Sequence, residues 1–387
     1  MTTVTRAQAL RFRARVQQLD RESVPDRALT DAAVLDLGVQ ATGQSAHTWA
    51  LVNRGVPIHD DPAAWGGQLA LAWTVRGAPH AYRRVDLPAV ELATRPFSEA
   101  DAGKRIFDAN RPLKQAGIPA VEALTRVASL MRELVVDPLP KGDLSTALSS
   151  ALPEPYLRWC RSCGARHTYE QPFRIAALHA GLELTPQTSP PVLRRVPDWD
   201  IDAPELNAPP VPDPWVPDAR LDLVRAGVHL LGPTTPEHVA AYLDAPVRDV
   251  RGRWPADAVQ VVVVDENAEA SPAWVLSTDL DALEGAVEPG DSPVVRLVGP
   301  HDLMLQVRDR ELLVPDPERR KELWPVLGRP GAVLVDGAPV GVWRPRATGK
   351  KLQVRTDAWG PWGRSVTARV RAQARLLARH RGLTLAE

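Results

Sequence analysis

The sequence has little cysteine, no long apolar run and no excess of charge of either sign. Its 387 residues include two cysteines, Cys160 and Cys163, which are too few for the disulfide framework of a small secreted protein. No run approaches the ~18 apolar residues of a membrane-spanning helix. The N-terminus also lacks the apolar core of a secretory signal. We therefore expect a cytoplasmic protein with no membrane partner.

The balanced charge hides an uneven distribution along the chain. Lys and Arg number 47, as do Asp and Glu, so the formal net charge is zero. Residues 341–387 nevertheless contain eleven Lys and Arg against two acidic residues. Local patches, not the total charge, determine attraction to a phosphate backbone. The C-terminal segment therefore favours nucleic-acid binding, with a solvated surface helix as the alternative.

The order of helix and strand patterns at the N-terminus is typical of a winged helix. Apolar spacing predicts a helix over 5–19 that Thr5 caps. Two shorter helices should follow, capped by Thr30 and Ser45. A strand pair then surrounds a turn at 76–79. Three helices followed by a strand pair are the elements of a winged helix.

The same order returns twice further along the chain. Residues 118–181 predict several helices, one of them over 153–164. Residues 218–277 predict two helices, a short recognition helix and a β-hairpin as the wing. These units share an order of elements and no sequence identity, so the repeat is inferred from order alone. The recognition helix of the third unit should project Arg248, Arg251 and Arg253.

The remaining segments predict a linker and a β-rich end. Prolines are dense over 185–218, which argues against helix and central strand there. Residues 333–345 read as strand, Asp-Gly turn and strand, and 365–382 as a basic helix. The expected fold is α+β, with these divisions: winged helices at 1–115, 116–200 and 219–298, a Pro-rich linker at 201–218, and a β-rich domain with a terminal basic helix at 299–387.

Three stretches carry a resemblance to a known family: "RRKELWPVLGRPGAVLVDGAPVGVWRPR", "WTVRGAPHAYRR" and "TPEHVAAYLDAPVRDVRGRWP". They resemble the bacterial winged helix DNA-binding domain family, whose best-known members are DNA glycosylases of the AlkZ and YcaQ type. Those members excise alkylated purines and unhook interstrand crosslinks. The resemblance spans roughly residues 5 to 381. It implies three tandem winged helices and a small β-domain, forming a C-shaped monomer with a basic concave channel for damaged or alkylated double-stranded DNA near the nucleoid.

The resemblance also indicates catalytic residues. Glycosylases of the family carry Gln-x-Gln or Gln-x-Asp after a Gly-aliphatic pair, and this chain reads "LGVQATGQS" at that place. Gln40 matches the first glutamine, Thr42 stands where the second catalytic side chain belongs, and Gln44 lies two residues further on. An amide can hold a water, whereas a carboxylate can also deprotonate it. A threonine is no base, so the motif predicts a weaker glycosylase, or a Gln40 that merely bonds backbone.

The expected DNA-binding residues come from turns, the recognition helix and the basic end. Arg and Lys side chains suit phosphate contact, and tryptophans on a Gly- and Pro-broken loop can stack on bases. The alternatives are solvated arginines, a structural histidine and tryptophans that pack in the core. The candidates besides Gln44 are Arg76, His80, Arg83, Arg84, Arg248, Arg251, Arg344, Arg346, Lys350, Lys351, Trp359, Trp362 and Arg364.

A short cysteine motif indicates a metal. Cys160, Cys163 and His167 supply three ligands of the kind that zinc prefers. A fourth would have to be Glu170, His179 or a distant residue. Two buried structural thiols at the end of a helix are the alternative. Catalysis itself should require no cofactor.

The sequence leaves two classes of function open. One is a monofunctional glycosylase that excises N7-alkylated purines, or unhooks crosslinks, by attack of water at the anomeric carbon. The other is a winged-helix protein that binds DNA without chemistry, for damage recognition or regulation of transcription. Transcription regulators usually dimerise to read two half-sites. A chain with three winged helices in tandem does not need to dimerise.

Overall fold

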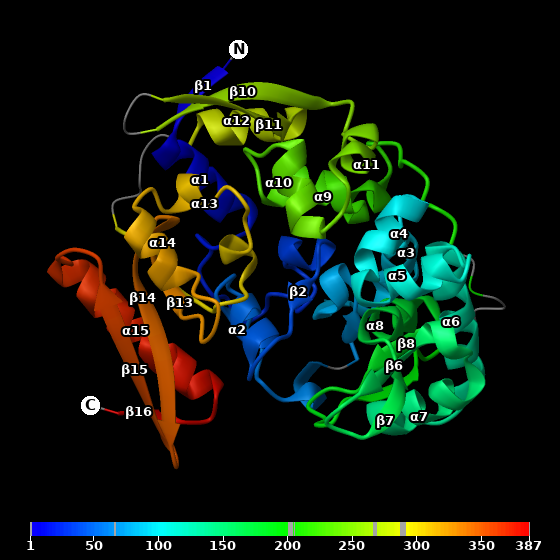
Figure 1. The fold of residues 1–387 in the computed structure, drawn as a ribbon. Coiled ribbons are helices and arrows are strands. Elements are labelled where there is room, and N and C mark those ends of the chain that lie inside the picture. The colour runs from blue at the N-terminus through cyan, green and yellow to red at the C-terminus, as the bar shows by residue number, and fades with distance from the viewer. Residues whose placement is uncertain are drawn as a thin grey trace. The chain divides into compact units, whose positions relative to one another are not determined.

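The computed structural model describes residues 2–65, 67–199, 204, 206–265, 269–286 and 292–386 (Figure 1). The chain forms two compact units. The first unit comprises residues 1–66, 224–242 and 254–387, and the second comprises 67–223 and 243–253. Both units mix helices with strands. Among the described residues, no helix is long and apolar enough to cross a membrane.

The first unit begins with a strand and a capped helix. Strand β1 (Thr2–Thr5) pairs in parallel with β10 (Ala258–Val264), which pairs antiparallel with β11 (Ala270–Leu276). Thr5 caps helix α1 (Arg6–Val16), as the sequence predicts, and its side chain forms a capping box with Gln8. The predicted antiparallel pairing of β10 with β11 is also confirmed, and its role as a wing stays a prediction. The helices beside this sheet are α9 (Leu223–Leu230), α10 (Pro236–Leu243) and α12 (Leu280–Glu284).

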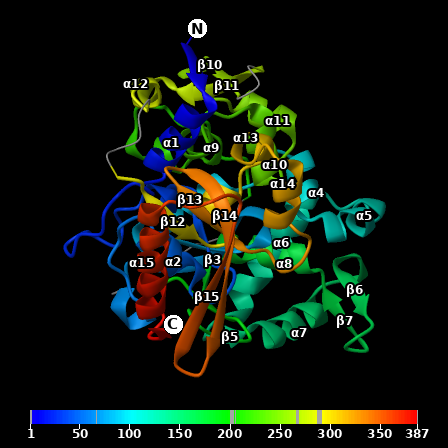
Figure 2. The same cartoon turned by 90° about the vertical axis from the view of Figure 1, so that its left-hand side faces the viewer.

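The C-terminal part of the first unit is a sheet with one long helix against it. The strands run in the order β12 (Val295–Val298), β13 (Gly331–Val335), β14 (Ala338–Thr348), β15 (Lys351–Ala358) and β16 (Thr384–Leu385). Asp336 and Gly337 turn between β13 and β14 with positive φ, as an Asp-Gly hairpin requires. Helix α15 (Arg364–His380) lies along the strands (Figure 2) and buries Val370, Ala374 and Leu377.

Short elements complete the first unit. They are the 3-10 helix η1 (Ala33–Asp36), β2 (Val39–Gln40), α2 (Ala46–Val52), η2 (Pro62–Trp65), η8 (Leu303–Leu305), α13 (Arg310–Leu313) and α14 (Pro317–Leu323). Among them, β2 and η8 flank the candidate site. Thr30 does not cap a helix, since η1 starts after Ala32. Ser45 occupies the predicted N-cap position of α2, but it has φ +57° and its side chain makes no capping hydrogen bond. The Ser45 hydroxyl donates to Asp60 instead.

The second unit packs helices around a small sheet. Its strands run β4 (Pro79–Arg83), β3 (Leu69–Trp73), β8 (Leu182–Leu184), β9 (Val192–Arg195) and β5 (Leu139–Pro140). A separate hairpin joins β6 (Leu157–Cys160) and β7 (Ala165–Thr168). The helices are α3 (Leu87–Thr94), α4 (Glu99–Arg105), α5 (Phe107–Gln115), α6 (Ala120–Leu134), α7 (Lys141–Ala151), α8 (Glu170–His179) and α11 (Val247–Gly252).

Two predicted elements of the second unit are wrong. The helix expected over 153–164 is a short 3-10 turn followed by β6. The proline-rich segment 185–218 contains β9, which pairs on both sides, with β8 and with β5. The prolines flank β9 and leave its own "VLRR" free to donate to both neighbours. Part of the expected linker, residues 201–203 and 205, lies outside the described residues. The three winged-helix units and the remaining domain boundaries stay predictions.

Candidate functional site

Gln40 is the last residue of β2 and is held by side chains on both ends of its amide. Its Nε2 donates to Thr42 Oγ1 at 2.9 Å, and its Oε1 accepts from Gln306 Nε2 at 3.0 Å. The amide of Gln306 also donates to the carbonyl of His301. Gly38 and Gly43 bend the chain on either side with φ of +85° and +95°, in a region that favours glycine. The motif therefore forms a hydrogen-bonded chain, Gln306 to Gln40 to Thr42.

A small pocket of the first unit opens beside this chain of amides. Gln40, Tyr242, His301 and Gln306 line it together with apolar side chains of η1 and η8. Gln40, Thr42, His301 and Gln306 are half-buried. The pocket has room for about one water, and partly buried amides beside it can hold that water in a fixed orientation. Gln44 is exposed and lies outside the residues that line the pocket.

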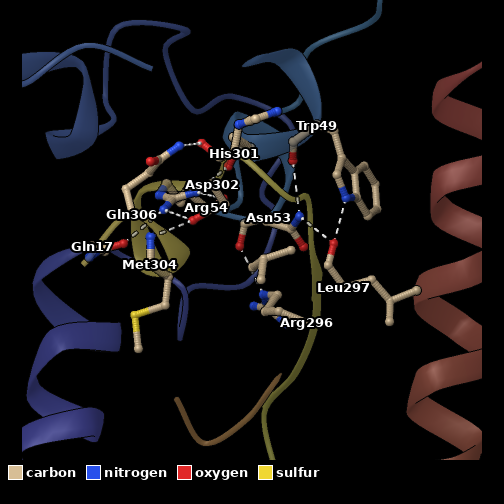
Figure 3. A network of polar contacts seen from close by, with 12 residues as sticks. Gln17, Trp49, Asn53, Arg54, Arg296, Leu297, His301, Asp302, Met304 and Gln306 are labelled. Atoms are coloured by element: carbon tan, nitrogen blue, oxygen red, sulfur yellow. Dashed lines mark hydrogen bonds and ion pairs between the residues drawn. The ribbon is translucent and has the colours of Figure 1, made fainter. Parts of the chain in front are cut away.

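A buried ion pair supports the segment that carries His301 and Gln306 (Figure 3). Arg54 and Asp302 form a bidentate pair at 2.8 and 2.9 Å, with side-chain exposures of 0% and 1%. Asp302 also caps η8 by accepting from the Met304 backbone N–H. Arg54 further donates to the Ala50 carbonyl and to Gln17. The pair thus ties α1 and α2 to the turn from which Gln306 reaches Gln40.

A buried polar cluster follows the motif along α2. Thr48 Oγ1 donates to Asp60 at 2.9 Å and lies 3.0 Å from His380 Nε2. His47, beside it, packs edge-on against Trp65. Burial lowers the pKa of His47 to about 4, although the carboxylate of Asp60 opposes this shift. His47 is therefore neutral at physiological pH and contributes to the core rather than to phosphate binding.

The predicted DNA-binding turn of the second unit is mostly engaged in its own fold. His80 is 1% exposed, and its Nδ1 lies 3.0 Å from Thr74 Oγ1 and 2.9 Å from the Ala78 carbonyl. Burial, and then the charge of Arg76, lower the pKa of His80 to about 3. A neutral, buried ring cannot reach a phosphate at the surface, so the prediction for His80 is corrected. Arg76 is half-buried with φ +59°.

The two other arginines of this turn already have acidic partners. Arg83 pairs with Asp86 at 3.2 Å, and Arg84 pairs with the buried Glu183 at 2.9 Å. Arg84 also donates to the backbone carbonyls of Gly67 and Leu69. Contact of these arginines with DNA stays a prediction.

Helix α11 presents its two arginines at the surface, and the third predicted arginine, Arg253, directly follows the helix. Arg248 and Arg251 are exposed. Arg253 does not project as expected, because it donates to the carbonyls of Pro209 and Pro210 and stacks on Phe97 with 4.9 Å between its guanidinium carbon and the ring centroid. The structure therefore brings Arg248 and Arg251 to the surface of the second unit and uses Arg253 inside it.

A group of exposed cations lies on the β14–β15 hairpin of the first unit. Arg344 and Arg346 point to the same side of β14, since side chains alternate along a strand, and Arg355 is the register partner of Arg344. Gly349 has φ +56° at the first position of the two-residue turn between the strands. The exposed cations near this hairpin are Arg344, Arg346, Lys350, Lys351, Arg355 and Arg364.

The two tryptophans after β15 pack rather than stand free on a loop. Trp359 Nε1 donates to Glu322 at 2.7 Å, and Trp362 Nε1 donates to the Val340 carbonyl at 3.3 Å. Both are half-buried. The expectation of an exposed stacking loop is therefore corrected, and contact of these two rings with DNA stays a prediction.

Cys160, Cys163 and His167 lie together on the β6–β7 hairpin. Their potential ligand atoms are all within 4.8 Å of one another. Both thiols are free, and Cys163 is exposed. The Ser162 hydroxyl, followed by Cys163, lowers the pKa of Cys160 to about 7. Neither Glu170 nor His179 belongs to this group. His179 pairs with Glu91, and Glu170 pairs with Lys141. The three residues fit a metal by their chemistry and proximity.

Sequence reasoning missed the residues that hold Gln40 in place. Gln306 is 266 positions away from Gln40 in the chain, and the Arg54–Asp302 pair spans 248 positions. The one local signal was Asp302 ahead of "LML", a residue type that caps helix starts. It predicts a turn there but not its partner.

These features can be set beside known proteins. The family model of the AlkZ-like DNA glycosylases matches residues 34–380. The chain belongs to that family, and a DNA glycosylase-type function with DNA as the partner follows from the membership. The solved structure of Streptomyces sahachiroi DNA glycosylase AlkZ is similar over 100% of both chains, with a TM-score of 0.70 and 19% sequence identity. That likeness shows a shared fold. Comparison with curated proteins gave no match.

Proposed function

We propose that this protein is a monofunctional glycosylase that removes N7-alkylated purines from duplex DNA, with Gln40 holding the attacking water. The observation that carries the proposal is the chain of hydrogen bonds from Gln306 through Gln40 to Thr42 beside a pocket. Gln40 also stands where the family's first catalytic glutamine is expected. The proposal needs no cofactor.

The chemistry asks little of the protein beyond orientation and charge stabilisation. An N7-alkylated purine is already cationic and leaves readily, so the sugar develops oxocarbenium character. The protein must then place a water at the anomeric carbon and stabilise positive charge. A carbonyl oxygen accepts two hydrogen bonds, so the bond from Gln306 to Gln40 Oε1 is compatible with a second one from a water.

Thr42 takes the place of a second amide or carboxylate in this scheme. Its Oγ1 accepts from Gln40 Nε2, which leaves the hydroxyl proton to be donated onward. A hydroxyl cannot deprotonate the water as a carboxylate can. We therefore expect excision that depends on a good leaving group, as in N7-alkylpurines or a crosslink joined through N7, and not on general-base catalysis.

Binding to the duplex rests on the exposed cations of the first unit. The β14–β15 hairpin and the start of α15 expose Arg344, Arg346, Lys350, Lys351 and Arg364. Such side chains neutralise phosphates and release counterions, which gives affinity without sequence preference. We propose that the protein acts as a monomer on damaged duplex DNA, and that Arg248 and Arg251 add phosphate contacts.

The test compares chemistry with binding on the same substrate. A duplex carrying a single N7-methylguanine is incubated with the full chain, and abasic sites are revealed by alkaline cleavage. A mobility-shift assay measures affinity for the same duplex. The proposal predicts enzyme-dependent strand cleavage. Tight binding without any cleavage would overturn it in favour of a protein that only binds DNA.

A further inference from the structure

The β6–β7 hairpin assembles soft ligands in a way that the proposed excision does not use. Cys160 ends β6, Cys163 lies in the turn, and His167 sits in β7 as the register partner of Arg158. Because side chains alternate along a strand, Cys160 and His167 project from the same face of the hairpin. Gly164, with φ +61°, bends the chain directly after Cys163. The turn thereby curls the second thiol back toward the first.

The polar atoms of this cluster have few hydrogen-bond partners among the described residues. His167 Nε2 is buried and has no hydrogen-bond partner among the residues that the structure describes. The two sulfurs lie 3.1 and 3.9 Å from the single hydroxyl of Ser162. A buried ring nitrogen without a partner is costly. A metal ion between the sulfurs and the ring would satisfy it.

The chemistry of the three ligands favours zinc over hard cations. Two thiolates and an imidazole are ligands that zinc binds tetrahedrally, and hard cations such as Mg²⁺ or Ca²⁺ prefer oxygen ligands. The spacing Cys-x-x-Cys lets both sulfurs of one turn face a single ion, as in structural zinc sites.

We propose that Cys160, Cys163 and His167 bind one zinc ion, with water in the fourth position, and that this ion fixes the hairpin. The metal would join the turn to the opposite strand and would add a cross-link to the backbone pairing of the hairpin. The other face of the hairpin carries Trp159, 62% exposed, opposite Arg166. In Figure 2 the hairpin lies at the edge of the second unit, beyond the end of α7. The site is independent of the proposed excision.

Metal content of the full chain tests this assignment. The protein is purified without chelators and its metals are measured by inductively coupled plasma mass spectrometry. We expect about one zinc per chain. The variants Cys160→Ser and His167→Gln should lose the zinc. Ser162→Ala, which keeps all three ligands, and His59→Gln, which removes an exposed histidine elsewhere, should retain it.

Cobalt substitution gives a second readout that does not depend on stability or on excision. Co²⁺ added to metal-free protein should produce the visible bands of a tetrahedral site and a thiolate-to-metal charge-transfer band, both absent in Cys160→Ser. Circular dichroism shows whether each variant is folded. Metal-free wild-type protein that also gives no cobalt bands would overturn the proposal. So would zinc that persists undiminished in a folded Cys160→Ser variant.

Discussion

Asp302→Asn should destabilise the first unit far more than the loss of an ordinary surface ion pair. Asp302 and Arg54 are 1% and 0% exposed and share two hydrogen bonds of 2.9 and 2.8 Å. Asparagine keeps an oxygen for the Met304 backbone N–H but removes the charge, so the guanidinium of Arg54 is left buried without its counter-ion. Breaking a buried pair in this way costs about 3–5 kcal/mol.

Urea unfolding followed by tryptophan fluorescence measures this cost. Lys321→Ala is the matched control, because Lys321 and Glu318 form an ion pair with exposures of 73% and 76%, and such pairs contribute less than about 1 kcal/mol. The double change Arg54→Met with Asp302→Leu removes both charges and should recover much of the stability. If Asp302→Asn costs no more than Lys321→Ala, the pair does not anchor the turn that carries Gln306.

Three other predictions follow from the site and its surroundings. Because the folded-state pKa of His47 is about 4 and the unfolded value 6.5, the unfolded chain binds the extra proton between these values. The free energy of unfolding should therefore fall by about 3 kcal/mol as the pH drops from 6.5 to 4. His47→Leu should remove that part of the pH dependence in unfolding titrations, and an unchanged acid profile would refute the assignment. Thr42→Gln should speed single-turnover excision by supplying a second amide, and slower excision would show that the hydroxyl itself is needed. Replacing Arg344 and Arg346 of the hairpin with alanine should make the plot of log affinity against log salt concentration less steep by about 2. An unchanged slope would exclude the hairpin from the DNA interface.

Local signals in the sequence predict the elements that depend on neighbouring residues. The capping box at Thr5 starts α1 where the sequence places it, and Asp336-Gly337 forms the predicted turn. Both depend on residues within a few positions of each other, so composition and spacing suffice. The helix predicted over 153–164 is wrong because a short apolar run does not distinguish a helix from a strand. Pairing with residues 165–168 makes residues 157–160 a strand.

The candidate site could be predicted only in part. Gln40 and Thr42 emerge from a motif, and the structure shows them bonded to each other. The burial of His80 does not follow from "RGAPHAYRR", because a turn rich in arginine reads as solvated until Thr74 and Tyr82 enclose the ring. The contacts of Gln306 and Asp302 join segments more than 240 positions apart. Contacts between segments so far apart cannot be predicted from the periodicity or the spacing of residues in the sequence.

The rate of excision by Gln40→Ala tests the central claim most directly. Single-turnover excision of N7-methylguanine is measured for wild-type protein and Gln40→Ala, together with the affinity of each for the same duplex. Because Gln40 is proposed to act on the transition state and not on phosphates, its loss should slow excision strongly and leave affinity nearly unchanged. Exposed His59→Gln serves as the control for an unrelated substitution. Equal excision rates for wild type and Gln40→Ala would contradict the account and place the chemistry elsewhere in the protein.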